Sequence, residues 1–357
     1  MDTTLSVIIV AHDSGPDLDR SLPALAPELG PGDEVIVLDN GSDGSAGPAI
    51  EAHLPAARLV PMGGNPGFAR AVNHGAELAR GDLLLVLNPD AAPRPGFGRA
   101  IRAPASSRPG WDAWMGLVGC RIEGELRVNT WGNPVHYTGI AWAGGHGRPL
   151  AEAGEAREIP VASGACLAVR REAWHRVGGL ADEFFLYHED IDFSLRLRAA
   201  GGRIGLEPAA LVDHEYEFGA NRLKWFWLER NRLAMVIRNY PGPLLALVAP
   251  VLLATELALI PVAARGGWLG HKLRSWGDLA RWLPRLLRER RELARRRVVP
   301  AARFARLLTP DLDSPLLPEA VRRGPVRWLL RGWWALVLAL LGPDRAGRGG
   351  RFRRGLR

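Results

Sequence analysis

Residues 83–90 read Leu-Leu-Leu-Val-Leu-Asn-Pro-Asp, an unbroken apolar run that ends abruptly in polar, turn-forming residues. An apolar run without polar alternation is typical of a strand that is buried on both faces, as in a parallel sheet. Asn-Pro-Asp favours the turn that ends such a strand. The stretch therefore predicts a central strand over 83–87, with the carboxylate of Asp90 at its carboxyl end.

The same pattern surrounds this strand. Further strands are predicted at 5–10, 35–38, 58–61 and 161–169, and helices at 17–29, 68–79, 171–177, 190–200 and 223–239. Strands and helices that alternate in this way indicate βαβ units and a mostly parallel α/β sheet. The stretch 104–160 is rich in Gly, Pro and Trp, and its pattern fits neither element.

Acidic residues follow several of these strands, namely Asp13, Asp39, Asp43 and Asp90. Ligands bind at the carboxyl ends of parallel strands, so we expect these residues to converge on one crevice. A carboxylate there can accept a hydrogen bond from a base or a ribose hydroxyl, although Asp is also an ordinary turn or helix-cap residue. The first loop lacks the G-x-G-x-x-G pattern, which disfavours an NAD(P) dehydrogenase.

Asp90 is also a candidate metal ligand. Mg²⁺ and Mn²⁺ prefer carboxylate and phosphate oxygens and often take few ligands from the protein. A single Asp at a strand end is enough where a diphosphate completes the coordination shell. His214 follows another apolar run. It is either a buried structural histidine or, if it faces Asp90, a second ligand.

Residues 188–192 read His-Glu-Asp-Ile-Asp at the start of a predicted helix. Acids in a first turn are favourable with the helix dipole, which is their ordinary role. Clustered carboxylates also raise one another's pKa, so that one of them can serve as a general base. Such a base serves reactions in which a hydroxyl must lose its proton while it attacks an electrophilic carbon.

Taken in order, these segments resemble family 2 of the glycosyltransferases over about two thirds of the chain. The resemblance runs from about Leu5 to Tyr240, and its Asn-Pro-Gly-Phe-Ala and Leu-Asn-Pro-Asp forms look most like the bacterial rhamnosyltransferase-like branch. The segments that carry it are residues 6–10, 39–45, 65–73, 81–90, 163–166, 170–172, 184–192 and His214.

The resemblance implies an α/β GT-A fold, with a donor site in the first half of the chain. Asp39 is then expected to contact the nucleotide base with Ala11 and Asp13 nearby, and Arg70 to contact the base or a phosphate. Asn65 and Gly67 belong to a matching donor-side segment.

The resemblance also assigns the chemistry. Asp90 matches the second acid of the family's DxD motif and is expected to bind Mg²⁺ or Mn²⁺ with the donor diphosphate, and Asn88 stands at the first acid's position. His214 matches a position that can complete the metal shell. Asp190, next to Glu189, matches the acid expected to act as the base in a single displacement with inversion.

The chain carries a net charge of +8, and all of this excess lies after residue 240, because residues 1–240 are net acidic. Residues 244–264 are apolar and long enough to span a bilayer, but Glu256 and two prolines disfavour spanning. Residues 273–293 alternate leucines with arginines, which is typical of an interfacial helix, and 326–341 adds tryptophans. An in-plane membrane anchor, a packed helical bundle and a spanning helix remain open. Nucleic-acid binding is not expected, because apolar residues dominate the helix faces.

The only two cysteines, Cys120 and Cys166, form no disulfide framework, and the first residues do not resemble a signal peptide. We therefore expect a cytoplasmic protein, peripheral or monotopic at the inner face of the cell membrane. Residues 1–240 are predicted to form the catalytic GT-A domain and 241–357 a basic, amphipathic, membrane-associating helical region.

The predicted function is inverting transfer of a sugar, with rhamnose a candidate, from a nucleotide sugar to a hydroxyl of a glycan or lipid-linked glycan in cell-surface polysaccharide synthesis. Two alternatives are a glycosyltransferase that acts on polyprenyl phosphate directly and a non-catalytic protein that binds sugar nucleotides.

Overall fold

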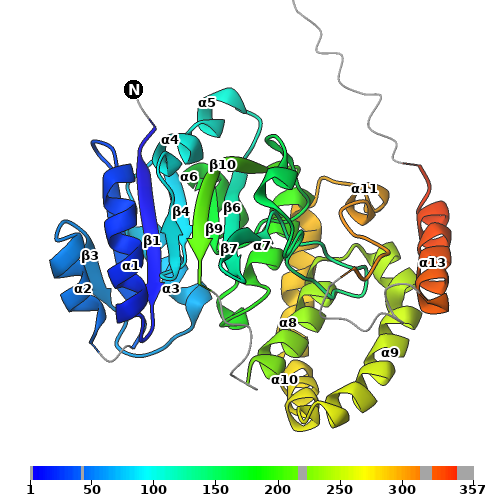
Figure 1. Ribbon diagram of the computed structural model, residues 1–357. Coiled ribbons are helices and arrows are strands. Elements are labelled where there is room, and N and C mark those ends of the chain that lie inside the picture. The colour runs from blue at the N-terminus through cyan, green and yellow to red at the C-terminus, as the bar shows by residue number, and fades with distance from the viewer. Residues whose placement is uncertain (1–2, 42–43, 216–222, 314–323, 344–357) are drawn as a thin grey trace, which may run out of the picture.

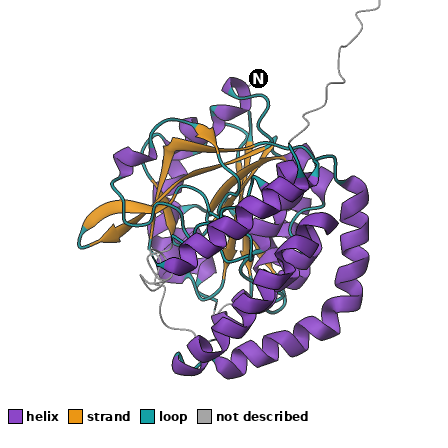
Figure 2. Ribbon diagram, turned by 90° about the vertical axis from the view of Figure 1, so that its right-hand side faces the viewer, coloured by secondary structure: helices purple, strands orange, loops and turns teal. Residues whose placement is uncertain are grey.

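The computed structural model describes residues 3–41, 44–215, 223–313 and 324–343; the candidate Asp43 lies outside them. One half of the molecule is a sheet flanked by helices, and the other is a group of long helices near the C-terminus (Figure 1). Figure 2 looks onto the helical half and shows its long helices running around that face.

The sheet has the strand order β3-β2-β1-β4-β9-β6-β10-β5. Neighbouring strands are parallel from β3 to β4 and between β6 and β10, whereas β9 and β5 run antiparallel to their neighbours. The strands are β1 (Leu5–Ala11), β2 (Glu34–Asp39), β3 (Arg58–Pro61), β4 (Leu83–Leu87), β5 (Ala91–Pro93), β6 (Ala113–Ile122), β7 (Glu125–Thr130), β8 (Arg157–Glu158), β9 (Cys166–Arg170) and β10 (Ile204–His214).

The helices divide between the two halves. Those of the sheet half are α1 (Gly15–Leu25), α2 (Ala46–His53), α3 (Phe68–Leu78), α4 (Phe97–Arg102), α5 (Pro104–Ser107), α6 (Arg171–Val177) and α7 (Glu189–Ala199), with short 3₁₀ turns at Ala26–Glu28, Leu150–Ala153 and Asp182–Phe184. Those of the helical half are α8 (Lys224–Asn239), α9 (Gly242–Arg265), α10 (Leu269–Arg296), α11 (Ala301–Ala305) and α13 (Pro325–Leu341).

The predicted α/β class with a mostly parallel sheet is confirmed. The strands β1 and β4 are buried along their whole length, as continuous apolar runs require. The strand predicted at 161–169 is wrong at its start, because β9 begins only at Cys166 and 161–165 form the loop before it. The unassigned stretch 104–160 contains β6, which pairs with β9 and β10 in the sheet.

Two hydrophobic clusters fill the molecule. The first lies between the sheet and its helices. The second combines α8–α13 with residues from before residue 200, among them Tyr137, Phe184 and Ile191. The ring of Tyr137 stacks on that of Trp334 at a centroid distance of 4.8 Å, so α13 is packed directly against a loop of the sheet half.

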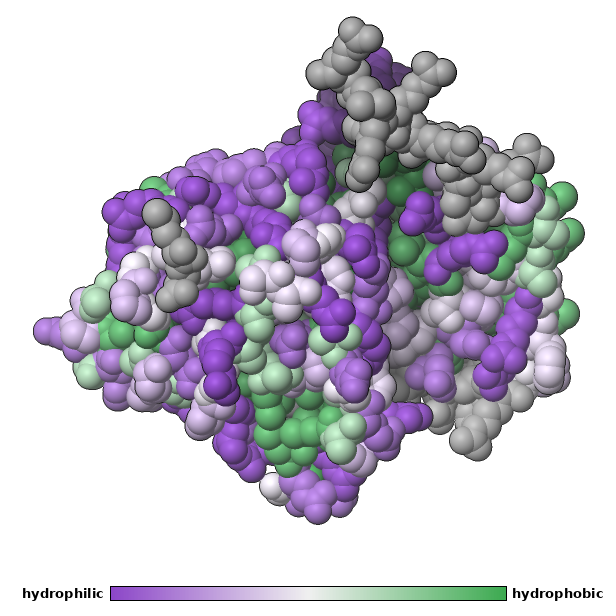
Figure 3. All heavy atoms as spheres, turned by 90° about the horizontal axis from the view of Figure 1, so that it is seen from above, coloured by the Kyte–Doolittle hydropathy of each residue, from purple (hydrophilic) through white to green (hydrophobic). Residues whose placement is uncertain are grey.

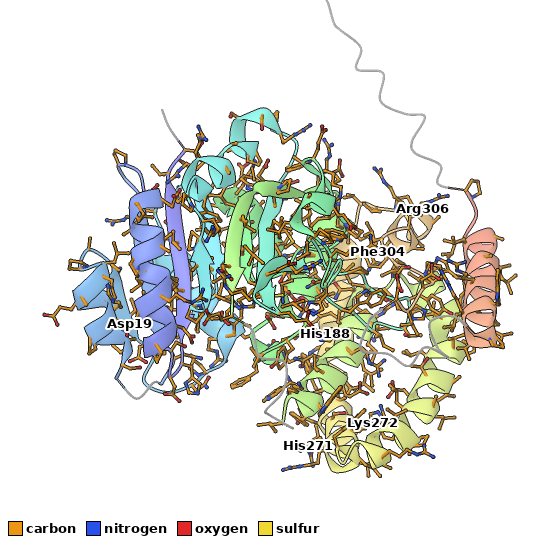
Figure 4. The ribbon with its side chains drawn as sticks, in the orientation of Figure 1. Asp19, His188, His271, Lys272, Phe304 and Arg306 are labelled. Carbon is orange, nitrogen blue, oxygen red and sulfur yellow. The ribbon has the colours of Figure 1, made fainter. Side chains whose placement is uncertain are left out.

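A buried group of charges joins α8, α9 and α10. The ammonium of Lys272, which is fully buried, lies 2.5 Å from Glu229 and 2.9 Å from Glu256, and Arg232 pairs with both of these acids. Trp276 donates from Nε1 to Glu256 at 2.9 Å. Figure 4 shows Lys272 between α10 and α9. Two acids and two cations cancel here, so each of these charges is compensated within the protein.

The outer faces of these helices are apolar. Among the described residues, α9 is the one helix long and apolar enough to cross a membrane. Its Glu256 points inward to the charge group, whereas Leu253 and Leu257 are more than half exposed. Exposed apolar residues also occur on α10 and α13, and Figure 3 shows hydrophobic surface along the edge of the molecule where α13 lies.

The buried charge group generates a stability prediction. Lys272→Met removes one cation and leaves two buried carboxylates facing Arg232 alone. We expect the free energy of unfolding, measured by denaturant titration, to fall by about 3–5 kcal/mol. Arg288→Met on the exposed surface of the same helix is the matched control and should change it by less than about 0.5 kcal/mol. Equal effects of the two substitutions would contradict this assignment.

Candidate active site

The sheet brings four strand ends to one edge. Ala11 at the end of β1 pairs with Asp39 at the end of β2, and β4 and β10 end on the same side in Leu87 and His214. The antiparallel β9 begins at this edge, where Cys166 pairs with Leu87. The loops that follow these ends carry most of the residues that the sequence singled out.

Asn65 ties the first three loops together. Its side-chain oxygen accepts hydrogen bonds from the amide of Asn40, at 2.9 Å, and from the backbone of Gly67, at 3.0 Å. Its amide nitrogen lies 3.4 Å from Nε2 of His12. The segments 11–13, 39–41 and 65–67 therefore form one connected surface. Asp39 is half-buried there, and Asp13 is exposed with a left-handed φ of 52°.

Arg70 lies apart from these contacts. It is on α3, its side chain is 60% exposed, and its Nε lies 3.4 Å from Asp182. Asp182 also accepts a 2.7 Å hydrogen bond from Asn73. In this conformation Arg70 is held toward the loop before α7.

Asp90 and His214 meet, as the sequence argument required for a shared metal role. Nε2 of His214 lies 3.0 Å from Oδ1 of Asp90 and 3.4 Å from the side-chain nitrogen of Asn88. The imidazole is buried and the carboxylate is 19% exposed. Strand pairing explains the contact, because Ala91, next to Asp90, pairs with His214 across β5 and β10.

This donor set fits a hard divalent cation only in part. In the described portion of the chain, no three His, Cys, Asp or Glu side chains gather closely enough to hold a metal by themselves. A carboxylate, an imidazole and an amide oxygen are suitable ligands when substrate phosphates supply the rest.

Asp17 on α1 is a neighbour of this pair that the sequence argument missed. Burial, followed by the negative charge of Asp90, raises the pKa of Asp17. Nothing in the sequence separates it from an ordinary acid in the first turn of a helix.

The acid pair at the start of α7 lies beside the same edge. Oδ2 of Asp190 accepts a 2.9 Å hydrogen bond from the backbone of Gly164, in the loop before β9, and Asn133 lies 3.5 Å away. Oδ1 accepts a 2.7 Å hydrogen bond from the backbone of Ile191. The neighbouring Ala165 accepts from the backbone of Asn88 at 3.0 Å, which links Asp190 to the segment that carries Asp90.

The three acids of this helix start have different surroundings. Burial, and then the charge of Asp190, raises the pKa of Glu189 to about 8. Burial also raises the pKa of Asp190, but backbone N–H groups from Gly164 and Ile191 oppose it. Burial alone would raise the pKa of Asp192, but Arg238 and Arg196 lower it instead. Burial thus favours the protonated form of both Glu189 and Asp190, whereas Arg238 and Arg196 favour the ionised form of Asp192, whose role is structural.

The loop that precedes Glu189 and Asp190 has strained backbone, and a residue of another element holds it in place. Phe185, Tyr187 and His188 all have left-handed φ values between 62° and 70°. Such backbone persists only where surrounding contacts enforce it. The side-chain nitrogen of the fully buried Asn231, on α8, lies 2.8–2.9 Å from the carbonyl oxygens of Phe184, Leu186 and Tyr187.

The same loop makes further contacts with the helical half and with the donor-side loop of the sheet half. Arg230 donates to the carbonyl oxygen of Glu183. Gly67 has a φ of 95°, and a Cβ there would lie 2.5 Å from the ring of Phe185, so the donor-side loop and the acid loop touch at a position that only glycine fits. His188 lies where the sheet half meets the helices (Figure 4).

This fold and this site define a glycosyltransferase of the GT-A class. A solved structure of GalNAc-T7 with UDP, GalNAc and Mn²⁺ superimposes with a TM-score of 0.55 at 18% identity, over 66% of this chain and 48% of that one. A structure of S. aureus TarS 1–349 with UDP-GlcNAc has a TM-score of 0.53 at 13% identity, over 95% and 90%. At these identities the similarity shows the fold.

Sequence comparison identifies the family. The family model "Glycosyl transferase family 2" matches residues 6–178, and "Glycosyl transferase family group 2" matches 99–273. An N-acetylglucosaminyl-diphospho-decaprenol L-rhamnosyltransferase of Mycobacterium tuberculosis is 30% identical over 246 residues, which is 62% of this chain and 79% of that protein. The O-antigen biosynthesis protein RfbC of Myxococcus xanthus is also 30% identical, over 58% of this chain but 17% of its own length. The chain belongs to glycosyltransferase family 2 and is rhamnosyltransferase-like.

The raised pKa of Glu189 generates a prediction for stability against pH. Between about pH 4.5 and 8 the unfolded carboxyl ionises while the folded one keeps its proton, so its contribution to stability is lost as pH rises. In Glu189→Gln this loss is absent. We expect the free energy of unfolding of the variant, relative to wild type, to rise by about 1 kcal/mol or more from pH 5 to pH 8. The exposed Glu172→Gln serves as the control. If the free energies of unfolding of Glu189→Gln and wild type differ by the same amount at pH 5 and pH 8, Glu189 is ionised in the folded protein.

Proposed function

We propose that this protein is an inverting glycosyltransferase that moves a sugar, with rhamnose the leading candidate, from a nucleotide-diphosphate sugar to a hydroxyl of a lipid-linked glycan in cell-surface polysaccharide synthesis. The observation that carries the proposal is the position of Asp190. Backbone hydrogen bonds hold its carboxylate at the sheet edge, one loop away from the Asp90–His214 pair. The site thus offers a base and a diphosphate-binding pair at the same edge.

In the proposed reaction, Asp190 accepts the proton of the acceptor hydroxyl. The hydroxyl oxygen forms a bond to the anomeric carbon while the bond from that carbon to the donor diphosphate breaks, and the bonding electrons leave with the nucleoside diphosphate. Because one displacement occurs from the side opposite the leaving group, the anomeric configuration is inverted. Burial raises the pKa of Glu189 to about 8, and a proton on Glu189 would limit the negative charge of the pair before substrate binds.

Asp90 and His214, with Asn88 beside them, would hold Mg²⁺ or Mn²⁺ together with the donor diphosphate. When bound, such an ion neutralises charge that develops on the leaving diphosphate. GalNAc-T7, which shares the fold, was crystallised with UDP and Mn²⁺, and this supports the choice of ion.

The connected surface of Ala11, Asp13, Asp39, Asn65 and Gly67 is the proposed nucleotide site. Arg70 reaches a donor phosphate only if it leaves Asp182, and its largely exposed side chain permits that movement.

We assign residues 1–240 to catalysis and 241–357 to association with a membrane surface. The rhamnosyltransferase of M. tuberculosis is named for a diphospho-decaprenol-linked acceptor, and such an acceptor resides in a membrane. The exposed apolar residues of α9, α10 and α13 and the exposed arginines of α10 support an in-plane membrane contact, which we place at the cytoplasmic face. The protein is expected to sediment with vesicles that contain phosphatidylglycerol; protein that stays in the supernatant would remove this assignment.

Asp190→Asn tests the base. Since the amide cannot accept the proton, we expect kcat to fall by about a thousandfold while the dissociation constant of the donor changes less than about threefold. Turnover is measured with a lipid-linked GlcNAc acceptor, and donor binding by calorimetry. The exposed Glu172→Gln is the control for loss of an acid. Unchanged turnover in Asp190→Asn would exclude Asp190 as the base.

Asp90→Ala tests the metal role. Wild-type protein should bind a nucleotide sugar more tightly with Mn²⁺ than with EDTA, and Asp90→Ala should lose most of this difference, with a tenfold or greater rise in the dissociation constant in Mn²⁺. His214→Ala should show the same loss to a smaller degree. Donor affinity in Asp90→Ala that still depends on Mn²⁺ as in wild type would contradict the assignment.

A further inference from the structure

A hollow on the helical half lies next to the acid loop. It is lined by Phe226 and Trp227 of α8 and by Arg274, Asp278 and Arg281 of α10. The three α10 residues are spaced four and three apart, so they share one face of the helix. The hollow is therefore a shared surface of α8 and α10.

Aromatic contacts connect this hollow to the catalytic edge. The ring of Trp227 stacks on that of Phe185 at a centroid distance of 4.5 Å, and Phe185 belongs to the strained loop that ends in Glu189 and Asp190. Phe185 also lies against Gly67 of the donor-side loop. The stacked rings of Trp227 and Phe185 thus stand between a molecule in the hollow and the loop that positions Asp190.

The hollow carries more positive than negative charge. Arg230 lies 4.4 Å from the ring centroid of Trp227 and pairs with Asp278 at 2.9 Å, so the one acid of the hollow is already neutralised. Arg274 and Arg281 are exposed and, within the described parts of the chain, neither guanidinium forms an ion pair or a side-chain hydrogen bond. The uncompensated charge of the wall is positive.

A second hollow near Asp90 lacks this property. It is lined by the three arginines Arg20, Arg94 and Arg121 and by as many acids, and Arg20 pairs with Glu215 and Arg121 with Asp213. An anion there would have to compete with these acids. The free guanidinium groups of the α8–α10 hollow make it the better site for a phosphate-bearing ligand.

We propose that Arg274 and Arg281 bind the diphosphate of a lipid-diphosphate-linked acceptor. Guanidinium groups bind phosphate oxygens through paired N–H donors, and each phosphate of such an acceptor carries negative charge. The sugar end then extends past Trp227 and Phe185 toward Asp190, and the lipid chain leaves past the exposed Leu273, next to Arg274 on α10. This inference rests on the proposed function for the identity of the acceptor.

The test uses direct binding of farnesyl diphosphate to the full chain, with EDTA present so that no metal bridges the probe to Asp90. The Arg274→Gln/Arg281→Gln double variant should bind the probe at least tenfold more weakly than wild type. The matched control is Arg288→Gln/Arg295→Gln. It removes the same charge from the same helix at the same seven-residue spacing, and both of its arginines are exposed. We expect less than a threefold change in the control.

Equal weakening in both double variants, or no weakening in either, would overturn the site, because the first result shows general charge attraction and the second shows binding elsewhere. Turnover gives the independent readout. Arg274→Gln/Arg281→Gln should raise KM for a lipid-diphosphate-linked GlcNAc about tenfold and leave KM for the donor unchanged. Wild-type protein that binds the probe but transfers no sugar to any acceptor would contradict the proposed function while the binding comparison still decides the site.

Discussion

The candidate active site depends on the contact between the side chain of Asn231 and the backbone of the loop before α7. That loop contains left-handed residues, and the amide of Asn231 reaches the carbonyl oxygens of Phe184, Leu186 and Tyr187. Left-handed backbone at non-glycine residues is unfavourable, so without these contacts the loop would relax. Asp190 follows directly, and its position at the sheet edge is therefore set from the helical half of the molecule.

The C-terminal helices therefore do more than pack against the sheet half: through Asn231 of α8 they help to position Asp190. Helix α8 carries Asn231 toward the acids and Glu229 and Arg232 toward the buried charge group, which fixes α8 against α9 and α10. Glu256 disfavours a membrane-spanning α9 on sequence grounds. In the fold its charge is compensated by Arg232 and Lys272, while the opposite face of the same helix exposes leucines. One helix can thus contribute to a polar interior and offer an apolar surface.

The sequence predicted the parts of the site that depend on strand ends. Apolar runs located β1, β2 and β4 to within about one residue at each end, and the topology of a parallel sheet was enough to expect Asp39 and Asp90 at one edge. Contacts made by residues distant in the sequence were not predictable. Asn133 lies in a stretch without regular pattern, and Asn231 resembles any polar residue of a helix. The different surroundings of Asp190 and Asp192 had one local signal, since Arg196 stands four residues after Asp192 and pairs with it at 2.7 Å.

The proposed reaction is a single displacement at the anomeric carbon, with Asp190 as the base. The most direct measurement is the anomeric configuration of the newly formed glycosidic bond, determined by proton NMR on the product of a nucleotide sugar and a lipid-linked GlcNAc acceptor. We expect a configuration opposite to that of the donor. A product that retains the donor's configuration would require two displacements or a front-side reaction and would exclude the single displacement with Asp190 as the base.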